Sequence, residues 1–286
     1  MAGRMDGKVV FITGAARGQG RSHALRLAEE GADIVACDLC AQIDSNLYPL
    51  ATPEDLDETV NLVEKLGRRI VARQADVRDR DALRAVVEEG MREFGHLDVV
   101  VANAGICPMG SGNPMDFVDA TDVDLIGVMN TVAVCLPHLP DGGSVVITGS
   151  TAGMMGGTTD TGSMGYGGMG YAWAKKTLIG YTEQMAMVLA ARSIRVNAVH
   201  PTNCNTHLLH NDELYRVFRP DLENPTREDV EPAFTYFQAM PIPYVEPLDI
   251  SNAVLYFACD ESRYVTGQQH RVDAGSLLRW PNGPQA

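Results

Sequence analysis

The chain has 286 residues, of which 45% are hydrophobic, and its 37 acidic and 23 basic side chains give a net charge of −14 at pH 7. This charge argues against a nucleic-acid partner and against an anionic membrane surface, because both require clustered Lys and Arg. The length suits one large α/β domain or two small ones. No apolar stretch has the length of a membrane span, and residues 1–6 are not followed by the apolar region of a signal peptide, so we expect a cytosolic protein.

Short apolar runs alternate with amphipathic segments along the chain. In chain order the pattern predicts a strand over 8–13, a helix over 21–30, a strand over 32–38, a helix over 54–66, a strand over 69–75, a helix over 80–94, a strand over 97–103, helical material over 118–136, a strand over 144–148, a helix over 171–192, a strand over 195–200, a helix over 247–258 and a strand around 270–273. Strands that are apolar on both faces form a parallel sheet covered on both sides. We therefore predict an α/β protein with a doubly wound parallel sheet of the Rossmann type and, because no repeat or linker divides the chain, a single domain over 1–286.

Three segments are long or irregular for a compact α/β domain. Residues 39–53 follow the second predicted strand, residues 202–245 precede the last predicted helix, and residues 153–170 are crowded with Gly, Met and Thr. Long segments of this kind often serve as lids or binding loops. We expect 202–245 to be a substrate loop.

A glycine-rich turn follows the first predicted strand and opens the first predicted helix. Glycines there allow a tight turn and a close approach to a pyrophosphate, and the free N–H groups of the helix N-terminus favour an anion. The alternative, a simple glycine-rich turn, fits this placement less well. The predicted nucleotide contacts in the turn are Gly14, Arg17, Gly18, Gln19 and Gly20.

Asp38 closes the second predicted strand, where a carboxylate accepts hydrogen bonds from ribose hydroxyls and repels a 2′-phosphate. Arg17 argues mildly in the other direction, because a guanidinium suits a phosphate. We favour Asp38 and predict NAD as the cofactor. Further cofactor contacts are expected at the ends of the third and fourth strands, namely Asp76, Val77, Asn103, Ala104 and Gly105. Asp76 could equally cap the next helix.

Tyr171 and Lys175 are four residues apart in a predicted helix, so their side chains share one face. A cation beside a phenol favours the phenolate, which a general base for an alcohol proton requires. Taken alone, this spacing is common on solvated helix faces. Tyr166 does not offer the same arrangement, because the residue four positions on is Gly170.

The six cysteines are scattered, and only Cys37 and Cys40 have a metal-like spacing. No second Cys or His pair completes a tetrahedral site, so we predict no metal. His200 and His207 could act in acid–base chemistry, but single histidines at strand ends are more often structural.

Together the motif at 13–20, Asn103-Ala104-Gly105, Ser150 and Tyr171-x-x-x-Lys175 resemble the short-chain dehydrogenase/reductase family over nearly the whole chain, from about Gly7 to Gly275. The extended glycine motif through His23, the run 48–56, Val-His-Pro-Thr at 199–202 and the run 215–222 resemble its mycofactocin-coupled, carveol-dehydrogenase-like branch.

That resemblance implies an enzyme with a Rossmann fold, assembled as a homotetramer. It implies tightly held NAD with the insertion at about 39–53 folded over it, and electrons that leave through a separate redox partner. In such an enzyme Tyr171 is the base, Lys175 lowers the pKa of its phenol and binds the nicotinamide ribose, and Ser150 binds the substrate oxygen. Pro201 and Thr206 would contact the nicotinamide end.

The chain departs from the family pattern at three places. Asp124 stands where the family has a catalytic Asn, and we expect it either to alter the proton relay or to pair with Lys175. Thr202 replaces the glycine that follows the proline. The interval between Ser150 and Tyr171 is longer than usual, so residues 153–170 should bulge outward.

We expect oxidation of an apolar, terpenoid-like secondary alcohol to a ketone. Two alternatives stay open: a ketone reductase with exchangeable NAD(P)H, and an inactive NAD-binding protein. The predicted substrate contacts, which could also be core residues, are Met109, Met154, Met155, Leu208, Leu209 and Phe218.

Overall fold

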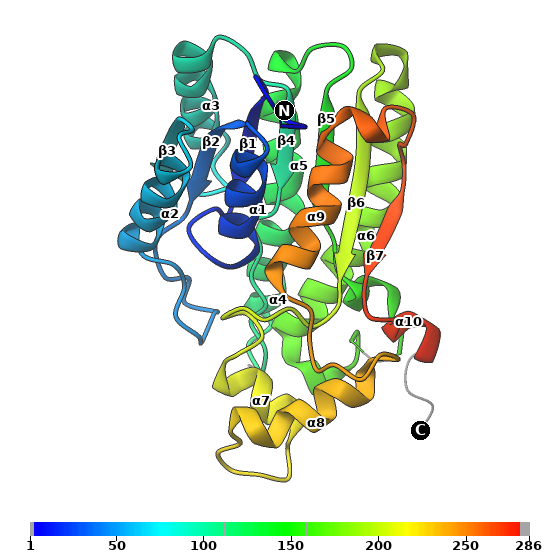
Figure 1. The fold of residues 1–286 in the computed structure, drawn as a ribbon. Helices are drawn as coiled ribbons and strands as arrows, with labels where there is room; N and C mark the ends of the chain where they lie inside the picture. Colours follow the sequence, from blue (N-terminus) through cyan, green and yellow to red (C-terminus); the bar gives the residue numbers. More distant parts are fainter. Residues whose placement is uncertain (1–2, 111, 158, 281–286) are drawn as a thin grey trace.

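A computed structural model describes residues 3–110, 112–157 and 159–280, so the two ends of the predicted 1–286 domain lie outside the described residues. Seven parallel strands form one sheet in the order β3-β2-β1-β4-β5-β6-β7 (Figure 1). The predicted doubly wound parallel sheet is confirmed. Its strands are β1 Val9–Thr13, β2 Asp33–Asp38, β3 Ile70–Gln74, β4 Val99–Ala102, β5 Ser144–Thr148, β6 Arg195–Pro201 and β7 Gln269–Val272.

Helices cover both faces of the sheet. One face is covered by α1 (Gly18–Glu29), α2 (Pro53–Lys65) and α9 (Pro247–Ala258), and the other by α3 (Arg80–Phe94), α5 (Val128–Cys135) and α6 (Gly165–Leu189). The remaining helices are α4 (Met115–Thr121), α7 (Asp212–Phe218), α8 (Arg227–Phe237) and α10 (Ser276–Arg279). In Figure 1, α7 and α8 lie below the carboxyl ends of the strands.

The period of two in a strand divides the core between the two faces. In β1, Val9 and Phe11 pack with α3 and α5, while Val10 and Ile12 pack with α1 and α9. Burying each such side chain stabilises the fold by about 1.5–3 kcal/mol relative to leaving it in water. Because both faces of every central strand are apolar, the polar site can form only where the strands end.

Three segments differ from their predicted structure. The glycine-rich part of 153–170 was expected to be irregular, but α6 already begins at Gly165. The segment 202–245 contains α7 and α8. The helical material at 118–136 is divided by a π-helical turn over Asp122–Gly127.

Tertiary packing explains the early start of α6. A Cβ on Gly167 would lie 2.0 Å from the carbonyl oxygen of Pro108, and one on Gly170 would lie 2.6 Å from that of Phe117. These glycines therefore let α6 approach its neighbours closely. This contact outweighs the low helix propensity of glycine.

The continuous helical run 115–138 is long and apolar enough to cross a membrane by length and composition, so the prediction that no apolar stretch has this length is wrong. However, 61% of its most apolar window is buried inside the fold. The run therefore resembles a core helix, and its α5 part packs against α3.

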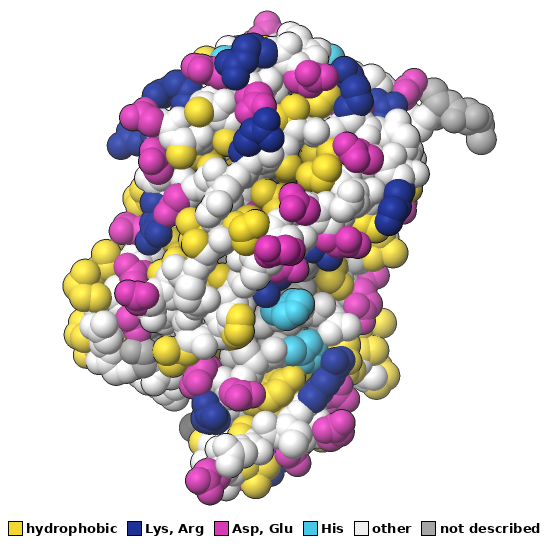
Figure 2. Space-filling view, turned by 90° about the vertical axis from the view of Figure 1, so that its left-hand side faces the viewer, with side chains coloured by type: hydrophobic (Ala, Val, Ile, Leu, Met, Phe, Trp, Pro, Cys, Tyr) yellow, Lys and Arg dark blue, Asp and Glu magenta, His cyan; other side chains and the backbone are white. Residues whose placement is uncertain are grey.

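The charges of the chain are dispersed over the surface that Figure 2 shows. Acidic and basic side chains alternate on this face and do not separate into patches of one sign. This face thus carries no basic stripe of the kind that binds a phosphate backbone.

We predict opposite effects of alanine at two helical glycines. A Cβ on Gly90 of α3 would lie 2.5 Å from Cγ2 of Val35 in β2, whereas a Cβ on Gly180 of α6 meets nothing within 4 Å in the described chain. Gly180→Ala should raise the free energy of unfolding by about 0.5–1 kcal/mol, because alanine favours the helix. Gly90→Ala should lower it by about 1–3 kcal/mol through overpacking.

Chemical denaturation of the two variants beside the wild type measures this difference. Equal effects of the two substitutions would contradict the packing of α3 on β2.

Candidate active site

A cavity opens at the carboxyl ends of the strands and brings together residues that are distant in sequence. It reaches from the glycine-rich turn, past the ends of β2, β4 and β5, to the segment after β6. The structure places in its wall every predicted cofactor and catalytic residue, namely Gly14, Arg17, Gly18, Gln19, Gly20, Asp38, Asp76, Val77, Asn103, Ala104, Gly105, Asp124, Ser150, Tyr171, Lys175, Pro201 and Thr206.

The glycine-rich turn has the geometry of an anion cradle. Gly14 and Gly18 have φ values of +67° and +57°, which favour glycine, and a Cβ on Gly20 would lie 1.9 Å from the carbonyl oxygen of Gly14. No acidic residue occupies the first turn of α1, and Arg17 at its N-cap makes no side-chain capping hydrogen bond. The first N–H groups of α1 are thus available to a pyrophosphate.

The Asp38 carboxylate is oriented by the backbone at the end of β2. Oδ2 accepts a hydrogen bond from the Ala16 N–H at 3.0 Å, and Oδ1 accepts one from the Cys40 N–H at 3.2 Å. Each oxygen keeps a further lone pair for a ligand hydroxyl. The arrangement suits a ribose better than a phosphate.

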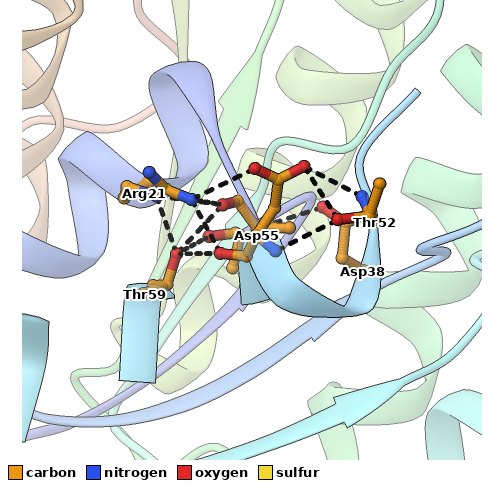
Figure 3. Close-up of polar contacts among 7 residues, drawn as sticks. Arg21, Asp38, Thr52, Asp55 and Thr59 are labelled. Carbon is orange, nitrogen blue, oxygen red and sulfur yellow. Dashed lines mark hydrogen bonds and ion pairs between the residues drawn. The ribbon is translucent and has the colours of Figure 1, made fainter. Parts of the chain in front are cut away.

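Arginines around this turn bind backbone carbonyls. The Arg17 guanidinium donates to the Pro49 carbonyl, so this cation is engaged by the loop after β2. Arg21 Nε donates to the Ala16 carbonyl at 3.0 Å, and its Nη2 donates to the Asp55 carbonyl at 2.7 Å (Figure 3). The Thr59 hydroxyl of α2 lies 3.0 Å from the Ala15 carbonyl. The glycine-rich turn is therefore joined to α2.

The insertion loop, residues 39–52, is braced internally and contacts both sides of the cavity. Gln42 Nε2 donates to the Tyr48 carbonyl at 3.2 Å, and its Oε1 accepts from the Leu50 N–H at 3.0 Å. The Tyr48 side chain is buried, and its hydroxyl accepts from the Cys107 N–H, just after β4, at 3.3 Å. Together with the contact of Arg17 to Pro49, this hydrogen bond carries the loop across the cavity.

The polar residues after β3 and β4 have different tasks. Asp76 does not cap α3, because Asp79 is the N-cap; the Asp76 carboxylate instead accepts from the Arg78 backbone N–H and guanidinium. Asn103 Nδ2 donates to the Thr13 carbonyl at 3.0 Å, and its Oδ1 accepts from the Thr148 hydroxyl at 3.2 Å. The Asn103 side chain thus joins the ends of β1, β4 and β5.

Lys175 is buried and forms an ion pair with Asp124. Its Nζ lies 3.1 Å from Asp124 Oδ1, donates to the Thr148 carbonyl at 3.0 Å, and lies 5.5 Å from the centre of the Tyr171 ring. Asp124 Oδ2 accepts from the Ile106 N–H at 3.2 Å. Of the two expected outcomes for Asp124, the structure therefore contains the pairing with Lys175.

The pKa of the Tyr171 phenol is raised well above its ordinary value, contrary to the expected effect of Lys175. Burial is the main cause, the Cys107 thiol and the Asp124 carboxylate act in the same direction, and a hydrogen bond from Ser150 lowers the pKa. Burial also raises the pKa of Asp124 to about 6, against the opposing effect of Lys175. Burial, together with the Asp124 carboxylate that offsets the Lys175 charge, thus favours the neutral phenol of Tyr171.

Ser150 lies just beyond β5, and its Oγ accepts from the Ala152 N–H at 3.1 Å. The long interval to Tyr171 forms a 3₁₀ turn over Thr151–Met154 and then exposed residues such as Gly156 and Gly157. A Cβ on Gly153 would lie 2.5 Å from the backbone of Lys175, so the turn packs directly on α6. The predicted outward bulge of 153–170 is therefore only partly correct: Gly156 and Gly157 are exposed, but Met155, Thr159 and Met164 line the cavity, and Ser150 stays in its wall.

The far end of the cavity is mostly apolar. Of the predicted substrate contacts, Met109, Met155, Leu208, Leu209 and Phe218 are in its wall. Met154 is not, so the predicted substrate contact of this residue is corrected: it ends the 3₁₀ turn, and the next residue, Met155, takes the place on the cavity side.

Several residues of the cavity wall were not among the predicted contacts. Tyr48 is the most notable, and its signal in the sequence was an aromatic side chain within the insertion at about 39–53. The others that were not predicted are Ile43, Cys107, Asn203, Leu214, Phe237 and Ser276.

Thr206, which was predicted, donates its hydroxyl to the Cys204 carbonyl at 3.4 Å, and its methyl group faces Gly18.

All six cysteines are free and buried, including Cys37 and Cys40. Within residues 3–110, 112–157 and 159–280, no group of three His, Cys, Asp or Glu side chains is arranged to hold a metal ion.

The geometry therefore combines a cradle for a dinucleotide with a proton-transfer group. The half-buried Tyr171 phenol, the Ser150 hydroxyl and the Lys175 ammonium share one wall, and an apolar compartment adjoins them. Such an arrangement can orient a polar oxygen and exchange its proton while a hydride passes to or from a bound cofactor.

Comparison with known proteins agrees with this geometry. The family model described as enoyl-(acyl carrier protein) reductase matches residues 14–276. A short-chain type dehydrogenase/reductase of Mycolicibacterium smegmatis is 51% identical, with 98% of this chain and 100% of the relative covered. The (−)-trans-carveol dehydrogenase of Rhodococcus erythropolis is 44% identical, with 96% and 99% covered. The crystal structure of carveol dehydrogenase from Mycobacterium avium in complex with NAD superposes with a TM-score of 0.90 at 48% identity, with 96% and 99% covered.

We predict that removing the buried cation destabilises the fold in a pH-dependent way. Lys175→Met should lower the free energy of unfolding by about 3–5 kcal/mol at pH 8, because Asp124 is then buried without a partner. Without the cation, the pKa of Asp124 in the folded chain rises above its value of about 6. Stability is then lost as the pH rises from about 4, the unfolded value, through that pKa, so the deficit should be smaller at pH 5 than at pH 8.

Urea denaturation at the two pH values measures this deficit. The double variant Lys175→Met with Asp124→Asn carries no buried charge and should recover most of the loss. A deficit of equal size in the single and double variants would contradict the ion pair.

Proposed function

The chain belongs to the short-chain dehydrogenase/reductase family, and from that premise we propose that it oxidises an apolar, terpenoid-like secondary alcohol to a ketone. It is an NAD-dependent alcohol dehydrogenase of this family. The observation that carries the proposal is the position of Ser150, Tyr171 and Lys175 in one cavity whose other end is the glycine-rich turn.

NAD fits the residues at that end. The N-terminus of α1 and the glycines beside it would hold the pyrophosphate, and Asp38 would bind the ribose hydroxyls. The one cation within the turn, Arg17, donates to the Pro49 carbonyl, so it is engaged elsewhere than at a 2′-phosphate. When bound, NAD supplies the hydride acceptor and a positive charge that favours the phenolate of Tyr171.

The chain's own residues would handle the proton. Tyr171 takes the proton of the substrate hydroxyl as general base, and the Ser150 hydroxyl donates a hydrogen bond to the same oxygen as charge develops on it. Lys175, which Asp124 holds in place, would bind the nicotinamide ribose, and the charge that favours the phenolate would come from bound NAD. The apolar wall around Met109, Met155 and Phe218 excludes water from the reacting carbon.

The substrate class rests on this wall and on the relatives. The compartment is bounded by a buried cluster that includes Leu209, Tyr215 and Phe234, and α7 and α8 form its outer side. Two of the proteins compared above are named carveol dehydrogenases. We therefore propose a terpenoid-like alcohol of similar polarity.

Carbonyl reduction is a second candidate, and one observation favours it. The burial of Tyr171 favours its neutral phenol, which is the form that donates a proton to a ketone oxygen. Family membership and the intact set of Ser150, Tyr171 and Lys175 argue against an inactive NAD-binding protein.

We also propose that NAD is held through many turnovers and that its electrons leave through a separate redox partner. The insertion loop supports this proposal, because it is anchored at Arg17 on one side of the cavity and after β4 on the other. A loop tied at both ends must open before a cofactor beneath it can leave.

A homotetramer in the cytoplasm completes the proposal. Trp173, Met187 and Val188 of α6 are exposed at 46%, 81% and 71%, which suits burial against another chain. Free cysteines throughout the chain agree with a reducing compartment.

Tyr171→Phe should lower kcat for alcohol oxidation by at least about a hundredfold, because the general base is lost. Tyr166→Phe, in the exposed first turn of the same helix, is the matched control and should retain wild-type activity. The measurement is oxidation of carveol and related alcohols by the purified protein with an artificial electron acceptor. Undiminished turnover of Tyr171→Phe would overturn the assignment of the base.

The purified protein should carry NAD that survives gel filtration and is released on denaturation. Gln42→Ala should speed exchange with labelled NAD by about tenfold, since the loop loses hydrogen bonds worth about 1.4 kcal/mol in total. Leu47→Ala, in the same loop with a side chain 56% exposed, should exchange like the wild type.

Rapid, repeated turnover with free NAD alone would contradict tight retention. Light scattering of the same sample measures the number of chains per particle, and a single chain would contradict the tetramer.

A further inference from the structure

His200 lies directly behind Ser150 and is not used by the chemistry described above. It is fully buried near the end of β6. Its Nδ1 lies 3.2 Å from both the backbone nitrogen and the backbone oxygen of Ser150, and its Nε2 lies 2.8 Å from Gln269 Oε1 in β7.

Gln269 decides which nitrogen of this ring carries the proton. The Gln269 Nε2 group donates to the Ile179 carbonyl of α6 at 3.1 Å, and a carbonyl can only accept. The Gln269 oxygen must therefore face His200, and Nε2 of the ring must bear the hydrogen. In a neutral ring Nδ1 is then bare and accepts from the Ser150 N–H.

Burial lowers the pKa of His200 below its ordinary value and thus favours the neutral ring. A protonated ring would present N–H at both nitrogens and would leave the Ser150 N–H without an acceptor.

Ser150 depends on this acceptor because it lies beyond the sheet. β5 ends at Thr148, and Gly149 still donates its N–H to the Val199 carbonyl of β6, whereas the Ser150 N–H donates to Nδ1 of His200. Beyond Ser150, the Thr151 hydroxyl donates to the Pro201 carbonyl at 3.2 Å. A Cβ on Gly149 would lie 2.4 Å from Nδ1 of His200, so the ring packs directly on the backbone that precedes Ser150.

We propose that His200, held in the Nε2-protonated tautomer by Gln269, is a positioning residue that sets the Ser150 backbone so that its hydroxyl meets the substrate oxygen. The inference rests on the proposed function. It goes beyond that function by giving Ser150 a support reaching from the Ile179 carbonyl of α6 through β7 and β6.

Two substitutions of His200 separate this role from simple packing. The Asn side chain places its amide oxygen the same number of bonds from Cβ as Nδ1, so His200→Asn keeps an acceptor for Ser150. The Gln side chain places its amide group at the distance of Nε2, so His200→Gln keeps the contact with Gln269 and loses that acceptor.

With the purified enzyme and an apolar alcohol, His200→Gln should lower kcat by about ten- to a hundredfold, because Ser150 is misplaced in the transition state. KM should change by less than about twofold, and His200→Asn should stay within about threefold of the wild type. Equal losses in the two variants would overturn the proposal, since they would indicate packing alone.

The same substitution in a Ser150→Ala background is the decisive control. If His200 acts through Ser150, the double variant should be no slower than Ser150→Ala by more than about twofold. Losses that multiply would overturn the proposal.

Hydrogen exchange of the Ser150 amide tests the inference without turnover, and thus separates its failure from that of the proposed function. The amide should be protected in the wild type and in His200→Asn and should exchange rapidly in His200→Gln. Equal protection in all three proteins would overturn the inference, whether or not the protein oxidises alcohols.

Discussion

The ammonium of Lys175, with a side chain only 3% exposed, is the charge around which the proton-transfer end of the chain is organised. A buried cation is tolerated only with a partner of opposite charge and satisfied hydrogen bonds. Here Asp124 supplies the charge and the Thr148 carbonyl supplies the acceptor, so α6, the π-helical turn and β5 meet at one atom. Gly105 must lack a side chain, since a Cβ there would lie 2.5 Å from Asp124 Oδ1. Because the two charges of this pair offset each other, little net positive charge is left to lower the pKa of the Tyr171 phenol.

The cofactor end of the cavity also relies on positively charged side chains that bind backbone carbonyls. There the cations Arg17 and Arg21 bind backbone carbonyls of the insertion loop, the glycine-rich turn and α2. These segments are not paired as strands, and they are held together by backbone carbonyls, which do not change protonation state. His200 extends this principle to Ser150, because the Ile179 carbonyl sets the orientation of Gln269 and thereby the tautomer of the ring.

Local patterns predicted the strands, the glycine-rich turn and the placement of Tyr171 and Lys175 on one helix face. They did not predict that α6 begins at Gly165 or that 202–245 contains two helices. Glycine and proline lower helix propensity in any window of sequence, whereas close packing and a buried apolar cluster stabilise these helices in the fold. Tyr48 and Met154 show the same limit, because the direction of a loop side chain follows from the contacts of the whole loop.

The amino-acid sequence by itself determined the α/β class, the nucleotide turn and the identity of the proton-transfer side chains. These depend on apolar periodicity, on glycine at positive φ and on spacing within one helical turn. Only the tertiary structure decided that Lys175 pairs with Asp124, that Tyr48 reaches the Cys107 N–H and that His200 supports Ser150. Each of these contacts joins residues 50 or more positions apart, and such contacts depend on how the strand ends converge and not on any local pattern.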